Sequence, residues 1–425
     1  MPEIVDLGYK ARPQFNPFHT RTQRFACIVA HRHAGKTVAC INDLQDGALR
    51  CDKPRPRFAY ISPYRGQSKQ VAWDYLRAAM YPLRALGATV NESELRADYH
   101  NGGQVRLYGA DNPDALRGIY LDGVVLDEPA DMDPRLWPEI VRPALADRGG
   151  WAVFIGTPRG RNHFHKVHVT AQSDPAWFSL VLKASETGLI TTDELESVRK
   201  DLSDNQYEQE FECSFDAAIQ GAYYGEALAQ AEREKRITGV AYEPTAPVWT
   251  AWDLGIADAT AIWFAQVVGR EIRIIDYYEA SGVDLGHYVR EINNKPYSYA
   301  GHIVPHDAQA KELGTGKTRL EVLESLGLRN LRVAPMHRVE DGINGVRVML
   351  PKCWFDAIKC ERGIDCLKLY RSEYDEKHQM LKPRPLHDYT SHAADAFRYL
   401  AITLDSVALK SAFSRKILYP RTGTA

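Results

Sequence analysis

Residues 25–37, FACIVAHRHAGKT, decide how the first half of the chain folds. The apolar run that ends at Ala30 predicts a buried strand, and the apolar spacing over residues 37–49 predicts a helix. Between them lie a glycine, a lysine and a threonine (35–37), as in a phosphate-binding loop. In such a loop, backbone N–H groups point at the phosphates, the lysine reaches the terminal ones and the hydroxyl ligates Mg²⁺. Ala30 replaces the usual first glycine, so this stretch alone fits a plain basic turn equally well.

Two later apolar runs end in polar residues that suit the same chemistry. GVVLDEP (123–129) ends with Asp127 and Glu128, and WAVFIGTP (151–158) ends with Thr157 close to its last residue. In a P-loop ATPase, an acid here holds magnesium through water, the next carboxylate polarises the attacking water, and a small polar residue senses the γ-phosphate. Each is also compatible with a solvated strand end, but the three signals in this order predict an ATPase.

Short apolar runs alternate with helical patterns through the first half of the chain. This alternation predicts a three-layer α/β domain around a parallel sheet. The polar, acid-rich residues 190–215 are expected to form a small helical subdomain. The expected strands are residues 24–30, 58–63, 104–110, 123–129, 151–158 and 178–184, with an amphipathic helix over 67–80.

The second half opens with three apolar runs separated by short turns, at residues 248–255, 260–269 and 271–280. The short turns predict an antiparallel meander. Helices and strands then alternate, which is the order of a ribonuclease-H-like domain. The expected later elements are a helix over 284–293, a strand over 302–307, a helix over 319–326, a strand over 331–335 and helices to about 404.

Three aspartates in this half lie on separate predicted elements. Asp253 is on the first strand, Asp307 ends the fourth and Asp395 is on a late helix, with Asp258 and Asp388 as reserve ligands. Carboxylates that converge can hold two divalent cations, which activate a water and stabilise the leaving oxygen of a phosphodiester. Taken singly, each is also compatible with a turn, a strand end or a solvated helix face. Three histidines nearby are expected to orient ligands, because hard cations prefer oxygen: His306, His387 and His392.

A second GKT, within residues 312–320, lacks a preceding apolar strand and is therefore not predicted to bind nucleotide. We expect this loop to contact DNA phosphates through Lys311, Lys317 and Arg319, although a mobile polar loop is the alternative.

The bulk composition narrows the class of protein. The chain has 425 residues, 44% hydrophobic and 25% charged, with a formal net charge of −2, so a globally basic nucleic-acid binder is not indicated. Its seven cysteines include no CxxC pair, which favours reduced, buried thiols in a cytosolic protein. Neither a signal pattern nor an apolar run of about 18 residues is visible, so secretion and membrane spanning are not expected.

Taken jointly, seven motifs make the chain resemble the large terminase subunits of bacteriophages over nearly its whole length. They are HRHAGKT, NPDALRGIYLDGVVLDEPADM, FIGTPRG, YEQEFECSF, AWDLGIADATAIW, VPHDAQAKE and HDYTSHAADAFRYL. The resemblance implies an α/β fold in which a RecA-like (ASCE) P-loop ATPase domain is followed by a ribonuclease-H-like nuclease domain. The expected division is an ATPase domain at 1–215 with a helical lid at about 185–215, a linker at 216–247 and the nuclease at 248–425.

The resemblance also implies roles for single residues. Arg32, Gly35, Lys36 and Thr37 would bind ATP, with Thr37 on its magnesium. Asp127 and Glu128 would be the magnesium-holding and catalytic acids, and Thr157 would couple hydrolysis to movement. Asp253, Asp307 and Asp395 would hold the nuclease metals. Arg117 would reach the ATP site of a neighbouring subunit, with Arg142 and Arg148 as competing candidates.

The implied cofactors are ATP and Mg²⁺, with Mn²⁺ in the nuclease site. The implied partners are double-stranded DNA, a portal protein, a small terminase subunit and further copies of the chain in a ring, expected to be a pentamer, on the procapsid. The implied location is the host cytoplasm, without membrane contact, and the mature virion would lack the protein. An ATP-dependent DNA-repair nuclease or helicase is the alternative, but its arginine-bearing motifs are not recognisable. A structural ring component is disfavoured, because both sites look chemically intact.

Overall fold

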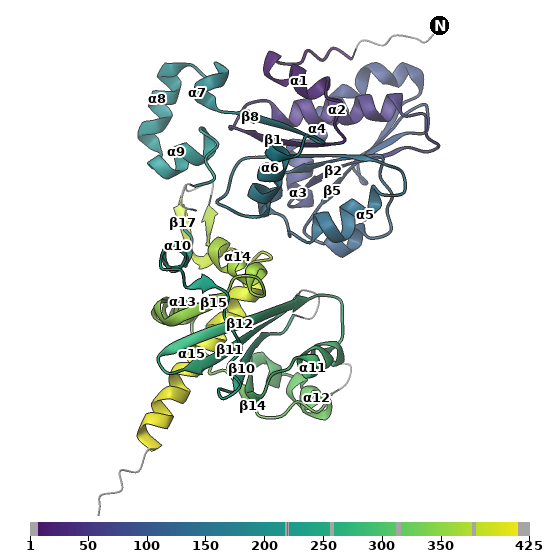
Figure 1. Ribbon diagram of the computed structural model, residues 1–425. Helices are drawn as coiled ribbons and strands as arrows, with labels where there is room; N and C mark the ends of the chain where they lie inside the picture. The colour runs from purple at the N-terminus through teal and green to yellow at the C-terminus, as the bar shows by residue number, and fades with distance from the viewer. Residues whose placement is uncertain are drawn as a thin grey trace, which may run out of the picture. The chain divides into compact units, whose positions relative to one another are not determined.

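The computed structural model describes residues 7–216, 219, 221–255, 259–311, 316–375 and 380–414. Contacts within the chain divide it into two compact units, Met1–Ala218 and Ile219–Ala425. Each unit is an α/β structure built around a sheet of its own (Figure 1).

The first unit contains an eight-stranded sheet of order β3-β4-β5-β2-β6-β7-β1-β8. Its strands are β1 (Phe25–Ala30), β2 (Arg57–Ser62), β3 (Thr89–Asn91), β4 (Arg96–Asp98), β5 (Gln104–Gly109), β6 (Gly123–Asp127), β7 (Trp151–Gly156) and β8 (Trp177–Leu182). The six strands from β5 to β8 in this order run parallel, as predicted. Because β7 lies between β1 and β6, the sheet has the additional strand of the ASCE class, and the predicted fold is confirmed. The antiparallel β3–β4 hairpin was not predicted, because its strands are short and polar.

Helices cover both faces of this sheet, and a hydrophobic core lies on each face. The helices are α1 (Asn16–His19), α2 (Lys36–Arg50), α3 (Arg65–Val71), α4 (Trp73–Ala79), α5 (Arg142–Ala144), α6 (His163–Ser173), α7 (Ala184–Thr187), α8 (Thr192–Asp201) and α9 (Asp204–Glu210), and the short helical turns are η1 (Pro13–Phe15), η2 (Tyr81–Leu86), η3 (Pro113–Leu116), η4 (Pro129–Asp131) and η5 (Leu136–Val141). The single helix expected over 67–80 is broken at Ala72, the C-cap residue of α3 and the N-cap residue of α4. Helices α7, α8 and α9 form the expected helical group beyond β8, with its own small apolar cluster (Figure 1).

The second unit contains a seven-stranded sheet of order β14-β13-β10-β11-β12-β15-β9. Its strands are β9 (Ile237–Thr238), β10 (Val248–Asp253), β11 (Thr260–Val268), β12 (Glu271–Ala280), β13 (Tyr299–Val304), β14 (Leu331–Val333) and β15 (Cys353–Asp356). Strands β10, β11 and β12 form the predicted antiparallel meander, and β13 and β14 continue the sheet in parallel beside β10. This is the order of a ribonuclease-H-like fold, as predicted.

Helices pack on the second sheet, and α15, which carries Asp395, lies against β10 and β11. The helices are α10 (Gly225–Arg233), α11 (Leu285–Asn294), α12 (Arg319–Ser325), α13 (Val339–Met349), α14 (Glu361–Leu369) and α15 (Ser391–Ser414), with turns η6 (His306–Gln309) and η7 (Leu350–Lys352). The sequence predicted only helices after residue 335, and this is wrong. Strand β15 extends the sheet, and β16 (Ser372–Asp375) and β17 (Met380–Pro385) form a hairpin.

The segment expected to be a linker, residues 216–247, is instead largely part of the second unit. It contains α10 and β9, and β9 pairs with β15. Tyr224 and Leu228 are buried in the core of the second unit, where Tyr224 stacks on Tyr370 with ring centroids 5.8 Å apart. The reason is that α10 is amphipathic and buries its apolar face.

All seven cysteines are free thiols, and six of them are buried. Among the described residues, no helix combines the length and the apolar character needed to cross a membrane.

Candidate functional site

The loop between β1 and α2 has an unusual backbone. His33 and Gly35 both adopt left-handed conformations, with φ of +62° and +98°. Glycine adopts this conformation without strain, whereas a residue with a side chain rarely does. Alternating conformations of this kind turn successive peptide groups in opposite directions, so N–H groups can gather on one side of the loop.

His31 braces the loop from within. It is fully buried, and burial lowers the pKa of its imidazole, so the ring is neutral near pH 7. Its Nδ1 lies 2.6 Å from the carbonyl oxygen of Arg32, and its Nε2 lies 3.0 Å from the hydroxyl oxygen of Thr187. Because a carbonyl can only accept, Nδ1 carries the proton, and Nε2 accepts from Thr187.

Three further carbonyls of the loop accept hydrogen bonds from cationic side chains. The Nζ of Lys36 donates to the carbonyl of Ala30 at 2.9 Å. One nitrogen of Arg12, Nη1, donates to the carbonyls of His33 and Ala34 at 2.9 and 2.8 Å. The acceptors of the loop are therefore occupied.

The amides where the loop enters α2 are in the opposite state. Among the described residues, no acceptor is present for the amides of Gly35, Lys36 and Thr37. These amides lie at the N-terminus of α2, where the helix dipole favours an anion. Free donors beside occupied acceptors fit a phosphate group.

Lys36 also contacts the two strand ends that the sequence singled out. Its Nζ is 3.2 Å from Oγ1 of Thr157 and 3.6 Å from Oε1 of Glu128. Glu128 accepts from the amide of Thr157 at 3.0 Å and from its hydroxyl at 3.3 Å. Three predicted site residues from the loop, β6 and β7 thus meet at one point.

Asp127 is buried, with an exposed fraction of 4%. Burial, followed by the charge of Glu128, raises the pKa of its carboxyl to about 7. It belongs to no ion pair of the described residues. A buried carboxyl that forms no ion pair fits an acid whose charge is stabilised when a divalent cation binds beside it.

Thr37 and Asp127 are the two predicted ligands of the ATP-bound magnesium. Both affect the pKa of the buried phenol of Tyr60. Burial, then the charge of Asp127, raises the pKa of Tyr60 well above its usual value. Tyr60 is fully buried in β2, and its position in an apolar strand gave no sequence signal.

Arg32, the other predicted nucleotide contact, faces the helical group. Its Nε is 2.8 Å from Oε2 of Glu210, and its amide donates to the carbonyl of Glu210 at 3.1 Å. The last residue of α9 is therefore attached to the loop by two bonds.

The three candidate arginine fingers differ in their contacts. Arg117 follows η3 and is 56% exposed, with its Nη2 3.6 Å from Glu139. Arg148 donates to the buried Asp122 at 2.8 Å, and Arg142 lies over the ring of Phe25. Arg148 is thus engaged within its own subunit, whereas Arg117 lies at the surface.

In the second unit, Asp253 ends β10, Asp307 lies in η6, and Asp395 lies in the first turns of α15. Burial raises the pKa of Asp253, and the charges of Asp395 and Asp307 add to this effect. Burial raises the pKa of Tyr399, and the charges of Asp253, Asp395 and Asp307 raise it further. The three predicted carboxylates are therefore close enough to interact.

Each of the three carboxylates also has a partner of its own. Over the described residues, no group of three side chains is arranged to hold a metal ion. Asp307 is the carboxylate with the greatest freedom, because its side chain is 56% exposed. The partners are His392 for Asp253 (Nδ1 to Oδ2, 3.1 Å), Arg319 for Asp307 (Nη1 to Oδ2, 3.8 Å) and Arg398 for Asp395 (Nη2 to Oδ1, 2.6 Å).

One expectation for this region is corrected. Arg319 is only 13% exposed, lies 3.8 Å from Asp307 and donates to the carbonyl of Leu254 at 3.1 Å, so it is not an exposed phosphate contact. Asp388 accepts from the amide of Thr390 at 2.9 Å and from its hydroxyl, in the turn before α15, and its role as a reserve ligand stays a prediction. Asp258 and residues 312–315 lie outside the described residues.

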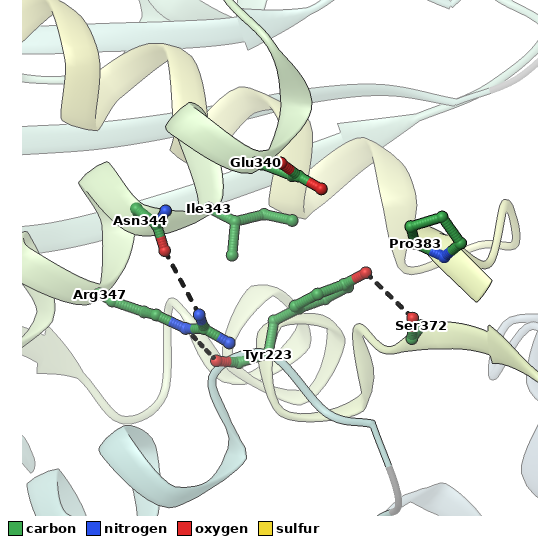
Figure 2. Close-up of a pocket in the computed structure, with 7 residues that line it drawn as sticks. All are labelled: Tyr223, Glu340, Ile343, Asn344, Arg347, Ser372 and Pro383. Atoms are coloured by element: carbon green, nitrogen blue, oxygen red, sulfur yellow. Dashed lines mark hydrogen bonds between the residues drawn. The ribbon is translucent and has the colours of Figure 1, made fainter. Parts of the chain in front are cut away.

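The second unit also has a cavity of about 300 Å³ between α13 and the β16–β17 hairpin. Its polar groups are largely bonded to one another: Arg347 donates to the carbonyl of Tyr223 and to Asn344, and the hydroxyl of Tyr223 donates to Ser372 (Figure 2). No predicted site residue lines it. Its lining consists of Tyr223, Glu340, Ile343, Asn344, Arg347, Ser372 and Pro383.

Comparison with known proteins adds an independent line of information. No protein-family model matches the chain. The chain is 21% identical over 399 residues to the large terminase subunit of Escherichia phage T5, which covers 90% of this chain and 87% of that one. It is 49% identical over 63 residues to the large terminase subunit of Thermus phage G20c, or 15% of this chain and 13% of that one.

Among solved structures, the ATPase domain of the large terminase of Thermus phage P74-26 aligns with a TM-score of 0.45 at 22% identity, covering 49% of this chain and 95% of that one. The resemblance that the motifs predict is confirmed: over nine tenths of its length, this chain is similar to a phage large terminase subunit.

Proposed function

We propose that the chain is the large terminase subunit of a double-stranded DNA phage. In this proposal, ATP hydrolysis in the first unit drives DNA into the procapsid, and a two-metal endonuclease in the second unit cuts the genome. The observation that best supports the proposal is the loop before α2, where bonded carbonyls and free amides form a cradle for phosphate. The carboxylates of the second unit supply the complementary nuclease chemistry.

In the first unit, the amides of Gly35, Lys36 and Thr37 would bind the phosphates of ATP. Thr37 and Asp127 would hold its magnesium, which neutralises charge on the transferred phosphoryl group. Glu128 would orient the attacking water. Thr157 and Lys36 hold Glu128, so a bound γ-phosphate would compete for both and release a carboxylate oxygen towards water. Arg32 would have to leave Glu210 to reach a phosphate.

In the second unit, Asp253, Asp307 and Asp395 would hold Mg²⁺ or Mn²⁺, which would activate a water and stabilise the leaving oxygen. The chain itself would orient these ligands: His392 holds Asp253, and Arg398 holds Asp395. Asp307, the most exposed of the three, would close the ligand set by a side-chain rotation.

The proposal includes the partners that a packaging motor needs. These are double-stranded DNA, a portal protein, a small terminase subunit and further copies of this chain in a pentameric ring. It locates the protein in the host cytoplasm during packaging and outside the mature virion.

Two single substitutions in the full chain test the pair of activities. Lys36→Ala should abolish ATP hydrolysis and leave DNA cleavage intact, because its Nζ lies at the nucleotide site of the first unit. Asp253→Asn should abolish metal-dependent cleavage and spare ATP hydrolysis, because the amide keeps the shape of the carboxylate without its charge. The measurements are phosphate release and linearisation of a plasmid with Mn²⁺.

Chelation of the metal should stop wild-type cleavage. Near-normal phosphate release by Lys36→Ala would reject the nucleotide site. Full cleavage by Asp253→Asn would reject the carboxylate site. A wild-type chain that neither hydrolyses ATP nor cuts DNA, with or without procapsids, would reject the proposed function.

A further inference from the structure

The segment before β1 reaches the loop through Arg12. Arg12 is the residue before η1, and two buried aromatic residues that follow it, Phe15 and Phe18, fix the segment on the core of the first unit. Its guanidinium lies directly against the loop, because a Cβ placed on Gly35 would be 3.3 Å from Nη1 of Arg12. The segment is therefore anchored on the core and touches the loop.

Arg12 supplies donors that the loop lacks. The backbone is left-handed at His33 and Gly35, on either side of Ala34, and the carbonyls of His33 and Ala34 both accept from Nη1 of Arg12. Among the described residues, Arg12 is the donor to both carbonyls. Unpaired backbone carbonyls favour other loop conformations, whereas a bond from a charged donor to a carbonyl is stronger than a neutral one.

The same segment supports the loop at a second point. Gln14 donates to the carbonyl of Thr187 at 2.8 Å, and the hydroxyl of Thr187 bonds to His31. The chain before β1 thus supports both ends of the loop, directly through Arg12 and indirectly through Gln14.

We infer that Arg12 is a positioning residue of the nucleotide site, which holds the loop in the shape that presents its free amides to phosphate. This inference rests on the proposed function, since it concerns the same site. Arg12 lies outside every motif of the chain and acts through the backbone of the loop, without contact to the reacting atoms.

The test is Arg12→Ala in the full chain, with Arg12→Lys as the conservative variant. Without the guanidinium the loop samples shapes that do not bind phosphate, so KM for ATP and Kd for ADP should rise about tenfold or more, since two charge-assisted bonds are lost. kcat should fall less, because Lys36, Glu128 and Thr157 are unchanged. One ammonium can still reach a carbonyl, so Arg12→Lys should lie between wild type and Arg12→Ala.

Arg50→Ala is the matched control. Arg50 is another exposed arginine of the first unit, 80% exposed, and pairs with Asp46 at the far end of α2 from the loop. Arg50→Ala should leave KM for ATP unchanged. Melting curves and DNA cleavage by the second unit report whether each variant remains folded, and Arg12→Lys keeps the test valid if Arg12→Ala is unstable.

An unchanged KM and Kd in folded Arg12→Ala would overturn the inference while leaving the proposed function intact. A fall in kcat at constant KM would also overturn it, because it would make Arg12 a catalytic group. If wild-type protein binds neither ATP nor ADP, both the inference and the proposed function fail.

Discussion

Glu128 illustrates at the scale of one residue how the proposed nucleotide site is built. Its backbone is left-handed, with φ of +53°, although it carries a side chain and precedes a proline. Such a conformation costs roughly 1–3 kcal/mol and persists only where surrounding contacts enforce it. Here the amide and hydroxyl of Thr157 donate to the carboxylate of Glu128, and the amide of Glu128 donates to the carbonyl of Ile155. The strain directs the side chain to Lys36 and Thr157.

The neighbouring Asp127 makes a pH-dependent contribution to stability. Its pKa in the folded chain is about 7, and that of an unfolded aspartate is about 3.9. Between these values, unfolding releases a proton, so this residue lowers the free energy of unfolding as pH rises. Asp127→Asn, without nucleotide and with chelator, should therefore melt at a higher temperature than wild type at pH 8 and at nearly the same temperature at pH 4.

Asp122→Asn provides the opposite control in the same unit. Burial acts to raise the pKa of Asp122, but the bond from Arg148 and the amide of Arg57 outweigh it, so the pKa is lowered. Its stabilising effect is present above the unfolded pKa and is lost as pH falls through the folded one. Asp122→Asn should thus destabilise most at neutral pH. Parallel pH profiles for the two variants would contradict the interpretation of Asp127.

At the scale of elements, the proposed nuclease carboxylates depend on close packing between helices and the sheet. A Cβ on Gly363 of α14 would lie 2.3 Å from the ring of Trp263 on β11. That ring cannot easily move, because its Nε1 donates to the carbonyl of Ala393 on α15, two residues before Asp395. Gly363→Ala should destabilise the second unit by about 1–3 kcal/mol, since overpacking outweighs the gain in helix propensity. Calorimetry of the full chain measures this.

Gly345→Ala on α13 is the control for this substitution. Its Cβ would meet Ile402 and Ala401 at 3.6 and 3.9 Å, which are ordinary contacts. It should be neutral or slightly stabilising. Equal melting temperatures for Gly363→Ala and wild type would show that β11 and α14 tolerate a greater separation.

The elements that the sequence predicts are those with a clear apolar pattern. The run FACIVA became β1, and GVVLD became β6, because strands buried on both faces consist of continuous apolar residues. Strand β15, CWFD, is four residues long and lies between helical patterns, and the β16–β17 hairpin is polar, so neither has such a pattern. The expected linker, residues 216–247, was wrong for a related reason: it contains an amphipathic helix, α10, that belongs to the second core.

The same distinction holds for the candidate site. Residues whose proposed chemistry requires one particular amino acid, such as Lys36, Glu128 and Asp253, stand in recognisable motifs. Arg12, His31 and Tyr60 act on the loop or on its acid through contacts distant in sequence, and many residue types could fill such positions. Only the folded chain brings them together.

At the scale of the whole molecule, two arginines near the proposed nucleotide site are engaged in ion pairs within the subunit. Lys36 lies at the site, while Arg159 pairs with Asp131 at 2.9 Å and Arg32 with Glu210 at 2.8 Å. Charge that builds on a transferred phosphoryl group is stabilised by a guanidinium, and a second subunit can supply it. Arg117 is suited to this role, because its side chain is 56% exposed and its Nη2 lies 3.6 Å from the exposed Glu139.

Mixing of two inactive variants tests this role of Arg117. Arg117→Ala should leave the ATP affinity of the isolated chain almost unchanged, because Arg117 lies outside the loop between β1 and α2 of its own subunit. It should remove assembly-dependent hydrolysis, since an arginine finger contributes about 10³–10⁵ in rate. Lys36→Ala should be inactive for a different reason. In mixed rings, an intact loop from the first variant can meet an intact arginine from the second, so part of the phosphate release should return.

The control for the mixing experiment is Arg77→Ala. Arg77 is an exposed arginine of the same unit that pairs with Asp74, and the variant should retain ATP hydrolysis without mixing. Arg148→Ala separates the competing candidate: Arg148 holds the buried Asp122, so its loss should lower the melting temperature of the isolated chain as well as hydrolysis. If Arg117→Ala and Lys36→Ala assemble together and release no more phosphate than either alone, Arg117 does not act across the subunit boundary. The missing charge would then have to come from within the subunit, and Arg32, released from Glu210, would be the residue to substitute next.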